Sequence, residues 1–332
     1  MVDTPMSFRY DSGVQPFNPL NYRSCLTAVH PPPAVSAWQE HIPFAMFLIE
    51  ILRPRVFVEL GVHTGASYLA FCQAIANLGV SCTCYGVDTF QGDEHAGRYE
   101  RHIESQLRER HDPLYGGFSR LVTSTFDEAA RYIPDGSVDL LHIDGMHSYE
   151  AVSHDFATWS PKLSARAVVL FHDINVRERG FGVWRFWEEQ SARFPHLAFS
   201  HGHGLGVLAV GREQPPEFEQ LLQLDKEEAE RFYALFFLLG HRITLQVELA
   251  ESKRALQASE TNRQAAAQSA ATITRLQQQL AEAEAEKESL RRQNGALRDT
   301  IDQLNNSVSF RLGMGATAPL RWISRKVGPS GS

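Results

Sequence analysis

Apolar and polar residues between positions 40 and 212 follow two alternating patterns. Short runs rich in β-branched and aromatic residues indicate strands, and apolar residues at helical spacing, such as Val152, Phe156 and Trp159, indicate helices between them. This alternation favours a doubly wound, mostly parallel α/β sheet covered by helices on both faces. The expected strands cover residues 55–60, 84–88, 121–123, 138–143 and 167–171, and a last strand at 204–210 is expected to join an antiparallel edge.

The pattern changes after residue 216, where a long stretch rich in Ala, Gln, Glu and Arg has strong helix propensity. We expect a linker helix over residues 213–244 and an α-helical coiled coil over residues 245–308. From Ile273 onward, apolar residues recur with heptad spacing. With Ile273 as position a, leucine occupies four of the five d positions.

Polar and charged residues along this heptad favour a parallel dimer. Lys287 and Asn294 occupy a positions, where polar side chains select a register at a cost in stability. Glu286 at g and Arg291 at e are offset correctly for an attractive pair between two chains. The sequence therefore predicts a homodimer, with a single solvated helix as the alternative. Before residue 273 the heptad is weak and rich in alanine, which suits a looser spacer.

The two ends of the chain differ from its centre. Residues 1–40 are rich in Pro, Asn and Ser, which predicts an N-terminal arm or lid. Residues 309–332 form a basic amphipathic tail with interspersed aromatic residues. Such a tail suits an anionic membrane surface or a docking partner, and a frayed terminus is an equal alternative.

Composition narrows the class of protein. The net charge of −7 gives no basic footprint for nucleic acid. The chain has neither an apolar run of about 18 residues, as a membrane span needs, nor the N-terminal pattern of a signal peptide. Its four cysteines are too few and too unevenly placed for a disulfide framework. We expect a cytoplasmic protein, for which a peripheral contact with the inner face of the membrane is an option.

The first strand leads into a glycine-bracketed loop and a helix, in the pattern E-x-G-x-x-x-G-x-S. Gly61 permits a tight turn and a close approach by a ligand. The N–H groups at the start of the following helix suit a carboxylate or a phosphate. This is the nucleotide-binding opening of an α/β domain, and an ordinary tight turn is the alternative. The candidate cofactor-binding residues here are Glu59, Gly61, Gly65 and Ser67.

A dinucleotide site is disfavoured at the same loop. Binding of a pyrophosphate against the backbone requires G-x-G-x-x-G, and Val62 and His63 stand where its second glycine belongs. The sequence therefore argues against an NAD-dependent oxidoreductase.

Two further stretches suit a nucleoside. Asp88 ends the second strand, where a carboxylate can accept both ribose hydroxyls. After the third strand, Thr125, Phe126 and Asp127 are expected beside an adenine, with the Phe126 ring lying on the base. Asp127 is equally suited to be the N-cap of the next helix.

Titratable residues gather after the fourth and fifth strands. The carboxyl ends of neighbouring strands open into the ligand crevice of a doubly wound sheet, so Asp144, His147, His172 and Asp173 should converge there. Such a group makes a catalytic site or a hard-metal site. Two carboxylates with Asn175 would suit Mg²⁺, which prefers oxygen ligands.

These stretches together resemble the class I S-adenosylmethionine (SAM) methyltransferases of the Methyltransf_24 type, which have a Rossmann-like fold and are found with bacterial surface-glycan assembly enzymes. The resemblance covers residues 40–212 and includes the motifs at 58–61, 87–97, 142–149, 170–173, 181–184 and 202–206. Shorter stretches of the tail, at 309–312 and 318–321, are similar to C-terminal ends of bacterial surface-polysaccharide glycosyltransferases.

The resemblance implies a methyltransferase domain over residues 41–212 with SAM as cofactor. Asp144 then belongs to both the cofactor site and the catalytic site. In the catechol O-methyltransferase-like branch, positions matching Asp144 and Asp173 bind a metal, and the position matching His147 is the base. This chain has Ile174 where that branch has Asn, and a histidine where that branch has its lysine base. The tentative metal ligands are therefore Asp144, Asp173 and Asn175.

The expected reaction is O-methylation of a sugar hydroxyl. A hydroxyl is hardly ionised at neutral pH, so a positioned base, His147 or secondarily His172, could contribute about 10²–10⁴-fold. A bound Mg²⁺ could acidify the hydroxyl instead. The alternative function is a non-catalytic scaffold with a SAM-type fold, which recruits glycosyltransferases through the coil and the tail.

Overall fold

The computed structural model describes residues 17–30, 36–93, 97–98 and 102–306. The expected basic tail at 309–332 lies outside the described residues, as do positions 1–16 and 31–35 of the expected arm. The chain divides into two compact units, residues 1–251 and residues 252–332.

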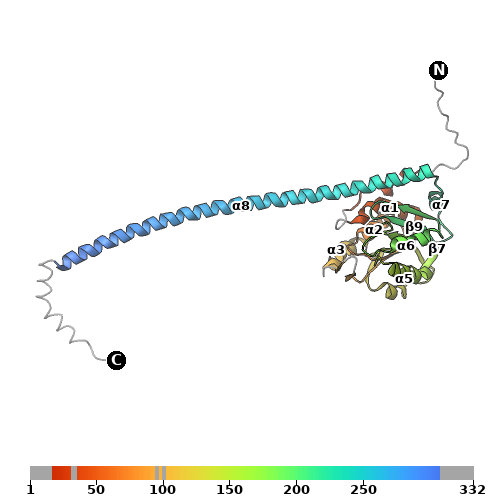
Figure 1. Ribbon diagram of the computed structural model, residues 1–332, viewed down its shortest axis with the longest axis horizontal. Coiled ribbons are helices and arrows are strands. Elements are labelled where there is room, and N and C mark those ends of the chain that lie inside the picture. Colours follow the sequence, from red (N-terminus) through yellow and green to blue (C-terminus); the bar gives the residue numbers. More distant parts are fainter. Residues whose placement is uncertain (1–16, 31–35, 94–96, 99–101, 307–332) are drawn as a thin grey trace, which may run out of the picture. The chain divides into compact units, whose positions relative to one another are not determined.

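The first unit is built on a seven-stranded sheet with the order β5-β2-β1-β6-β7-β9-β8. Strands β7 and β9 of this sheet are labelled in Figure 1. The five strands from β5 to β7 are parallel, and β9 runs antiparallel to both β7 and β8. This confirms the doubly wound, mostly parallel sheet with an antiparallel edge. The strands are β1 (Val56–Leu60), β2 (Thr83–Asp88), β5 (Ser119–Thr123), β6 (Val138–Ile143), β7 (Leu163–His172), β8 (His196–Phe199) and β9 (Leu205–Ala209), with a separate hairpin of β3 (Gly92–Asp93) and β4 (Gly97–Arg98).

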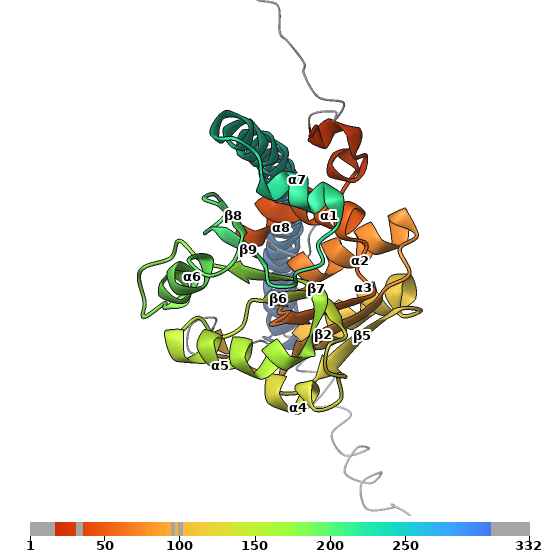
Figure 2. The same ribbon diagram turned by 90° about the vertical axis from the view of Figure 1, so that its right-hand side faces the viewer.

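Helices cover both faces of the sheet (Figure 2). One apolar core packs the sheet against α1 (Ile42–Leu52), α2 (Ala66–Leu78), α3 (Ile103–Tyr115), α7 (Pro216–Leu222) and the beginning of α8 (Lys226–Asn306). The other packs it against α4 (Phe126–Ala130), α5 (Tyr149–Trp159) and α6 (Val183–Ser191). Short 3-10 turns lie at Pro19–Asn21, Ser24–Leu26, Ala37–His41 and Ser160–Lys162.

The expected arm is partly built into this unit. Ser36 and Gln39 form a capping box at the start of the turn Ala37–His41, which leads directly into α1. The Trp38 indole is only 2% exposed and packs on Phe71 of α2. Residues 36–41 are thus part of the core instead of a detached lid.

The expected linker helix also differs from the structure. Residues 213–244 contain α7 and the first turns of α8, in which Phe232, Phe236 and Ile243 are buried. The rings of Phe232 and Phe236 pack against Phe44 and Phe47 of α1. This segment therefore completes the hydrophobic core, because its aromatic face covers α1.

The second unit, as far as it is described, consists of the remainder of α8 up to Asn306. Every side chain from 252 to 306 is exposed. Among the described residues, no helix is both long and apolar enough to cross a membrane. The four cysteines are free and buried in the first unit, as expected.

Candidate active site

Two cavities open at the carboxyl ends of the parallel strands. The first, of about 220 Å³, is lined by residues that include Asp88, Thr125, Phe126 and Gly145. The second, of about 260 Å³, is lined by residues from the β1–α2 loop, the ends of β6 and β7, and the N-terminal segment 36–38. Both cavities are lined by Gly61, Asp144 and His147, so they meet at these residues.

Gly61 is required by a close contact with the loop that follows β6. Its φ of +89° lies in the left-handed region, and a Cβ there would stand 2.1 Å from the carbonyl oxygen of Asp144. The glycine thus lets the loops after β1 and β6 approach closely, and this contact, more than a ligand's approach, fixes the residue type. Gly65 is similar: its φ is +85°, and a Cβ would stand 2.5 Å from Leu107 of α3.

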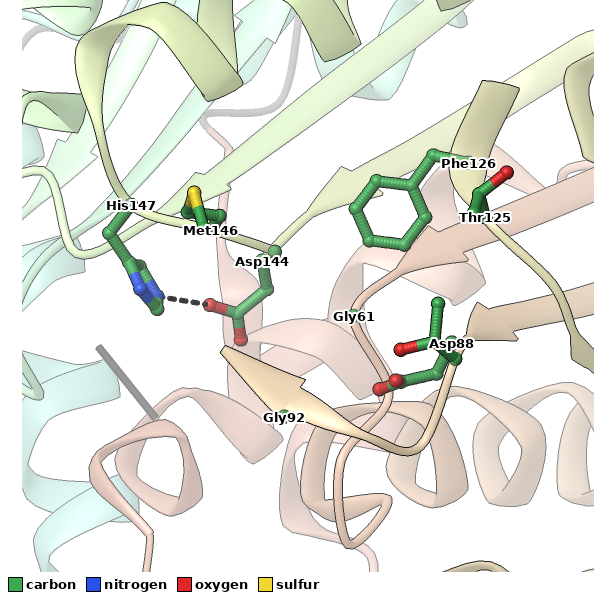
Figure 3. A pocket seen from close by; sticks show the side chains of 10 residues that line it. Gly61, Asp88, Gly92, Thr125, Phe126, Asp144, Met146 and His147 are labelled. Atoms are coloured by element: carbon green, nitrogen blue, oxygen red, sulfur yellow. Dashed lines mark ion pairs between the residues drawn. The ribbon is translucent and has the colours of Figure 1, made fainter. Parts of the chain in front are cut away.

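Asp88 both orders the first loop and lines the first cavity. Its Oδ2 accepts the backbone N–H groups of Val62 and His63 at 2.9 and 2.8 Å, and its Oδ1 accepts that of Phe90 at 2.7 Å. A carboxylate has about four acceptor sites, so these three bonds leave capacity for a ligand hydroxyl. Figure 3 shows Asp88 and Phe126 on one side of the cavity, and Asp144 with His147 on the other.

The start of α4 forms the wall of the first cavity. Thr125 is the N-cap, since its hydroxyl accepts the N–H of Glu128 at 3.3 Å. The Phe126 ring lies against Gly145, where a Cβ would come within 2.5 Å of it. Asp127 is neither the N-cap nor a lining residue, because its carboxylate pairs with His154 at 2.8 Å on the exposed surface.

Glu59 belongs to a buried polar chain, and it is not among the residues that line the two cavities. Its oxygens accept the Ser67 hydroxyl at 2.7 Å and contact Nδ1 of His142 at 3.0 Å. The Trp38 indole N–H donates to Nε2 of His142 at 3.2 Å, so the proton of this imidazole sits on Nδ1, directed at Glu59. Burial raises the pKa of Glu59, against the opposing effect of His142 and Ser67.

This placement differs from the expected role of Glu59 and Ser67 as cofactor ligands. Ser67 does line the second cavity, but its hydroxyl is used by Glu59. The two residues hold α2 and segment 36–38 onto the sheet, because an acidic group buried between strands needs internal partners.

The expected convergence at the ends of β6 and β7 is present. Nε2 of His147 lies 2.9 Å from Asp173 Oδ2 and 3.6 Å from Asp144 Oδ1. Nδ1 of His172 lies 3.3 Å from Asp144 Oδ1, while its Nε2 donates to the carbonyl of Gly202 at 2.9 Å. Two carboxylates and two imidazoles therefore form one ion-pair network.

The carboxylates of this network raise the pKa of both histidines and so favour their cationic form. Burial lowers the pKa of His147, but its bonds to Asp144 and Asp173 outweigh burial and raise that pKa to about 10. The pKa of His172 is raised to about 9 by the same carboxylates, again against burial. Although burial acts in the opposite direction, the histidines hold the pKa of Asp144 well below its ordinary value, and they also lower that of Asp173. In this arrangement the carboxylates favour the protonated form of both histidines, and the role of His147 as the base stays a prediction.

One group of side chains here could hold a metal ion. Ligand atoms of Asp144, His147 and Asp173 all lie within 4.8 Å of one another, and this oxygen-rich donor set fits a hard divalent cation. Asn175 lines neither cavity, and its amide nitrogen donates to the carbonyl of Ser200 at 3.0 Å. His147 thus takes the third position that the sequence assigned to Asn175.

Several lining residues of the second cavity were given no role by the sequence. Phe181 stacks on His147 with ring centroids 4.5 Å apart, and the Arg179 guanidinium lies 5.2 Å from the Phe181 ring. Nδ1 of His203 contacts Asp173 at 3.0 Å. Phe181 and His203 lie in the motifs at 181–184 and 202–206. The resemblance therefore included both residues, but it did not indicate what they contact.

Backbone strain is concentrated at this cavity. Six described non-glycine residues have left-handed φ values, and four of them line the second cavity: His63, Asp173, Arg179 and His203. Such conformations cost about 1–3 kcal/mol each and persist where the surroundings hold them, often at active sites. The strain supports the second cavity as a functional one.

Comparisons with known proteins give a family match and a curated relative. A family model described as a methyltransferase domain matches residues 58–174. The uncharacterized protein y4gI of Sinorhizobium fredii is 54% identical over 178 residues, which make up 54% of this chain and 20% of that protein. The chain thus spans about a fifth of the length of the curated relative that it matches.

Solved structures with a related fold include several O-methyltransferases. TomG of Streptomyces achromogenes, in complex with SAM, is 18% identical, with 54% of this chain and 82% of that chain covered and a TM-score of 0.40. NovP is 16% identical, with coverage of 52% and 80% and a TM-score of 0.42. At these scores no substrate is transferred to this chain.

The strand order, the loop after β1 and the family match over residues 58–174 agree with the class I methyltransferase fold. SAM is the cofactor of that class.

Proposed function

We propose that this protein is a SAM-dependent O-methyltransferase that acts on a sugar hydroxyl in the biosynthesis of a bacterial surface polysaccharide or a related glycan. The observation that carries the proposal is the meeting of two cavities at Asp144 and His147. One cavity has the groups a nucleoside needs, and the other contains the ion-pair network. The glycan as acceptor rests on the resemblance of the sequence motifs alone.

In this proposal the first cavity binds the adenosine part of SAM. The remaining acceptor capacity of Asp88 takes ribose hydroxyls, and the Phe126 ring lies on the adenine. The methionine part extends past Gly61 toward the second cavity, where the acceptor hydroxyl enters. SAM supplies an activated methyl group, so the chain mainly has to align the hydroxyl, which is worth up to about 7–11 kcal/mol.

The proton of the acceptor hydroxyl must also leave. His147 can take it only after losing its own proton, because Asp144 and Asp173 keep the imidazole cationic in the ligand-free site. A positive charge placed near these carboxylates lowers the pKa of His147 and makes it a base. A divalent cation held by Asp144, His147 and Asp173 would instead take the lone pair of the His147 imidazole, so His147 would then be a ligand and the cation itself would acidify the hydroxyl.

Calorimetry of SAM binding tests the cofactor assignment. We expect micromolar binding by the wild type, loss of at least tenfold in affinity in Asp88→Ala, and no change in Glu109→Ala, which removes an exposed acid from α3. Thermal unfolding of each variant shows whether the Asp88→Ala loop still folds. Repeating the titration with and without Mg²⁺ tests whether the cation contributes.

A transfer assay tests the acceptor class. Methyl-labelled SAM is incubated with the protein and a bacterial surface-polysaccharide fraction, and we expect label in base-stable methyl ethers of the sugar. Label in protein or lipid alone contradicts the sugar acceptor. No SAM binding under any condition overturns the enzyme and favours the scaffold that recruits glycosyltransferases.

A further inference from the structure

The second unit has an apolar stripe exposed to water. The stripe consists of Ile273, Leu276, Leu280, Leu290, Leu297 and Ile301, whose exposed fractions lie between 52% and 60%. An all-polar helix can be stabilised by ion pairs along its own surface, but a long exposed apolar stripe marks a surface that a partner covers. The remaining question is what covers it.

The period of the stripe selects a helical partner. An ideal straight α-helix drifts about 20° per heptad, so a strict seven-residue repeat stays in contact only with another helix that supercoils around it. Of the exposed leucines before residue 273, Leu245 falls at an a position, but Leu249 and Leu256 fall at e and do not keep this phase. The a and d positions that keep the heptad, which we call the seam, therefore begin at residue 273, later than the expected start at 245.

The polar residues of the seam select a second copy of the same chain. In a parallel pair in register, a residues meet their own counterparts, so the two Asn294 amides can bond to each other. In an antiparallel pair a residues face d residues. Every d residue from 276 to 297 is Leu or Ala, so Asn294 and Lys287 would lie against apolar side chains.

Charge at the edges of the seam agrees with the parallel arrangement. Glu286 at g lies opposite Arg291 at e of the other chain, and each of the other four g–e pairs contains an uncharged residue. On the face of α8 away from the a and d positions, Arg292 forms an ion pair of 3.0 Å with Glu288 of the same helix. Within the described chain, neither Glu286 nor Arg291 has an ion pair of that kind.

We propose that residues 273–301 of α8 form a parallel, in-register coiled coil with the same residues of a second copy of this chain. This inference is independent of the proposed methyl transfer. It rests on the stripe, its period and the residues at a, e and g.

Disulfide trapping in the full-length protein tests orientation and register. Ala283 is a small d residue in the seam, and Ala285 is an f residue on the outer face of the same turn. With oxidised glutathione as the oxidant, we expect Ala283→Cys to form a disulfide-linked dimer at least ten times faster than Ala285→Cys. The four natural cysteines are buried, so they give little background. Equal rates for the two variants overturn the parallel register.

Sedimentation equilibrium tests whether the stripe is the contact. We expect twice the mass of one chain for the wild type and for Ala285→Asp, and the mass of one chain for Leu290→Asp combined with Leu297→Asp. Unchanged tryptophan fluorescence confirms that the first unit stays folded in the double variant. A monomeric wild type, a larger assembly, or a double variant that remains dimeric contradicts the proposal.

Discussion

Gly145 controls the position of the ring that we assign to the adenine. It directly follows Asp144, and a Cβ at this position would stand 2.5 Å from Cε2 and 2.9 Å from Cζ of Phe126. Ordinary contacts begin near 3.4 Å, so the ring in Gly145→Ala must move by roughly 1 Å. Both residues line the first cavity, and the movement therefore changes its wall.

Overpacking of this kind costs about 1–3 kcal/mol. If the cofactor needs the present ring position, the whole cost is borne by binding, and the Kd for SAM rises roughly five- to 150-fold. The assay is calorimetric titration of SAM into wild type, Gly145→Ala and Gly117→Ala. Gly117 is the matched control, since a Cβ there meets no atom within 4 Å and its φ is not left-handed.

The contact between Phe126 and the cofactor would be refuted if the Kd of Gly145→Ala were unchanged while its free energy of unfolding were lower than that of the wild type. The cost of overpacking would then fall on folding and not on binding. An equal loss in Gly117→Ala would show that the effect is not specific to the cavity wall.

Two further predictions concern stability, measured by urea unfolding with tryptophan fluorescence. Burial, with a contribution from Asp127, raises the pKa of Asp155 from 3.8 to about 7, so the folded state loses stability as pH rises between these values. The free energy of unfolding of Asp155→Asn, relative to that of the wild type, should therefore increase by about 1.4 kcal/mol per pH unit between about pH 5 and pH 7. The exposed control Glu150→Gln should show no such increase. A difference for Asp155→Asn that becomes smaller as pH rises contradicts this prediction. Trp38→Phe removes the donor to buried His142 and should cost about 1–3 kcal/mol, and a variant as stable as the wild type would show that the bond is dispensable.

Most of the sheet was predictable because each strand carries its own signal. Parallel strands buried on both faces read as continuous apolar runs, and those around Leu60, Ile143 and Phe171 were recognisable without any tertiary information. Asp144, His147, His172 and Asp173 could be grouped because neighbouring parallel strands open at the same edge. Local sequence and topology together sufficed for this part of the site.

The remaining features depend on contacts between distant residues. Nothing near Glu59 reveals that His142, 83 positions away, will contact its carboxylate, or that Trp38 will donate to the other nitrogen of His142. The protonation of His147 likewise depends on Asp173, which lies in another loop. The bond of the Asn175 amide nitrogen to Ser200 also joins two separate loops, and no local pattern in the sequence indicates it.

The buried chain of Trp38, His142, Glu59 and Ser67 has a practical consequence for cutting the protein into fragments. A catalytic fragment beginning at residue 41 would lack Trp38, so it would lose a wall of the second cavity and leave His142 without its donor in the core. A fragment ending at residue 212 would uncover Phe44 and Phe47, on which Phe232 and Phe236 pack. The smallest self-sufficient piece therefore extends well beyond the matched domain in both directions, and its natural end is near residue 251.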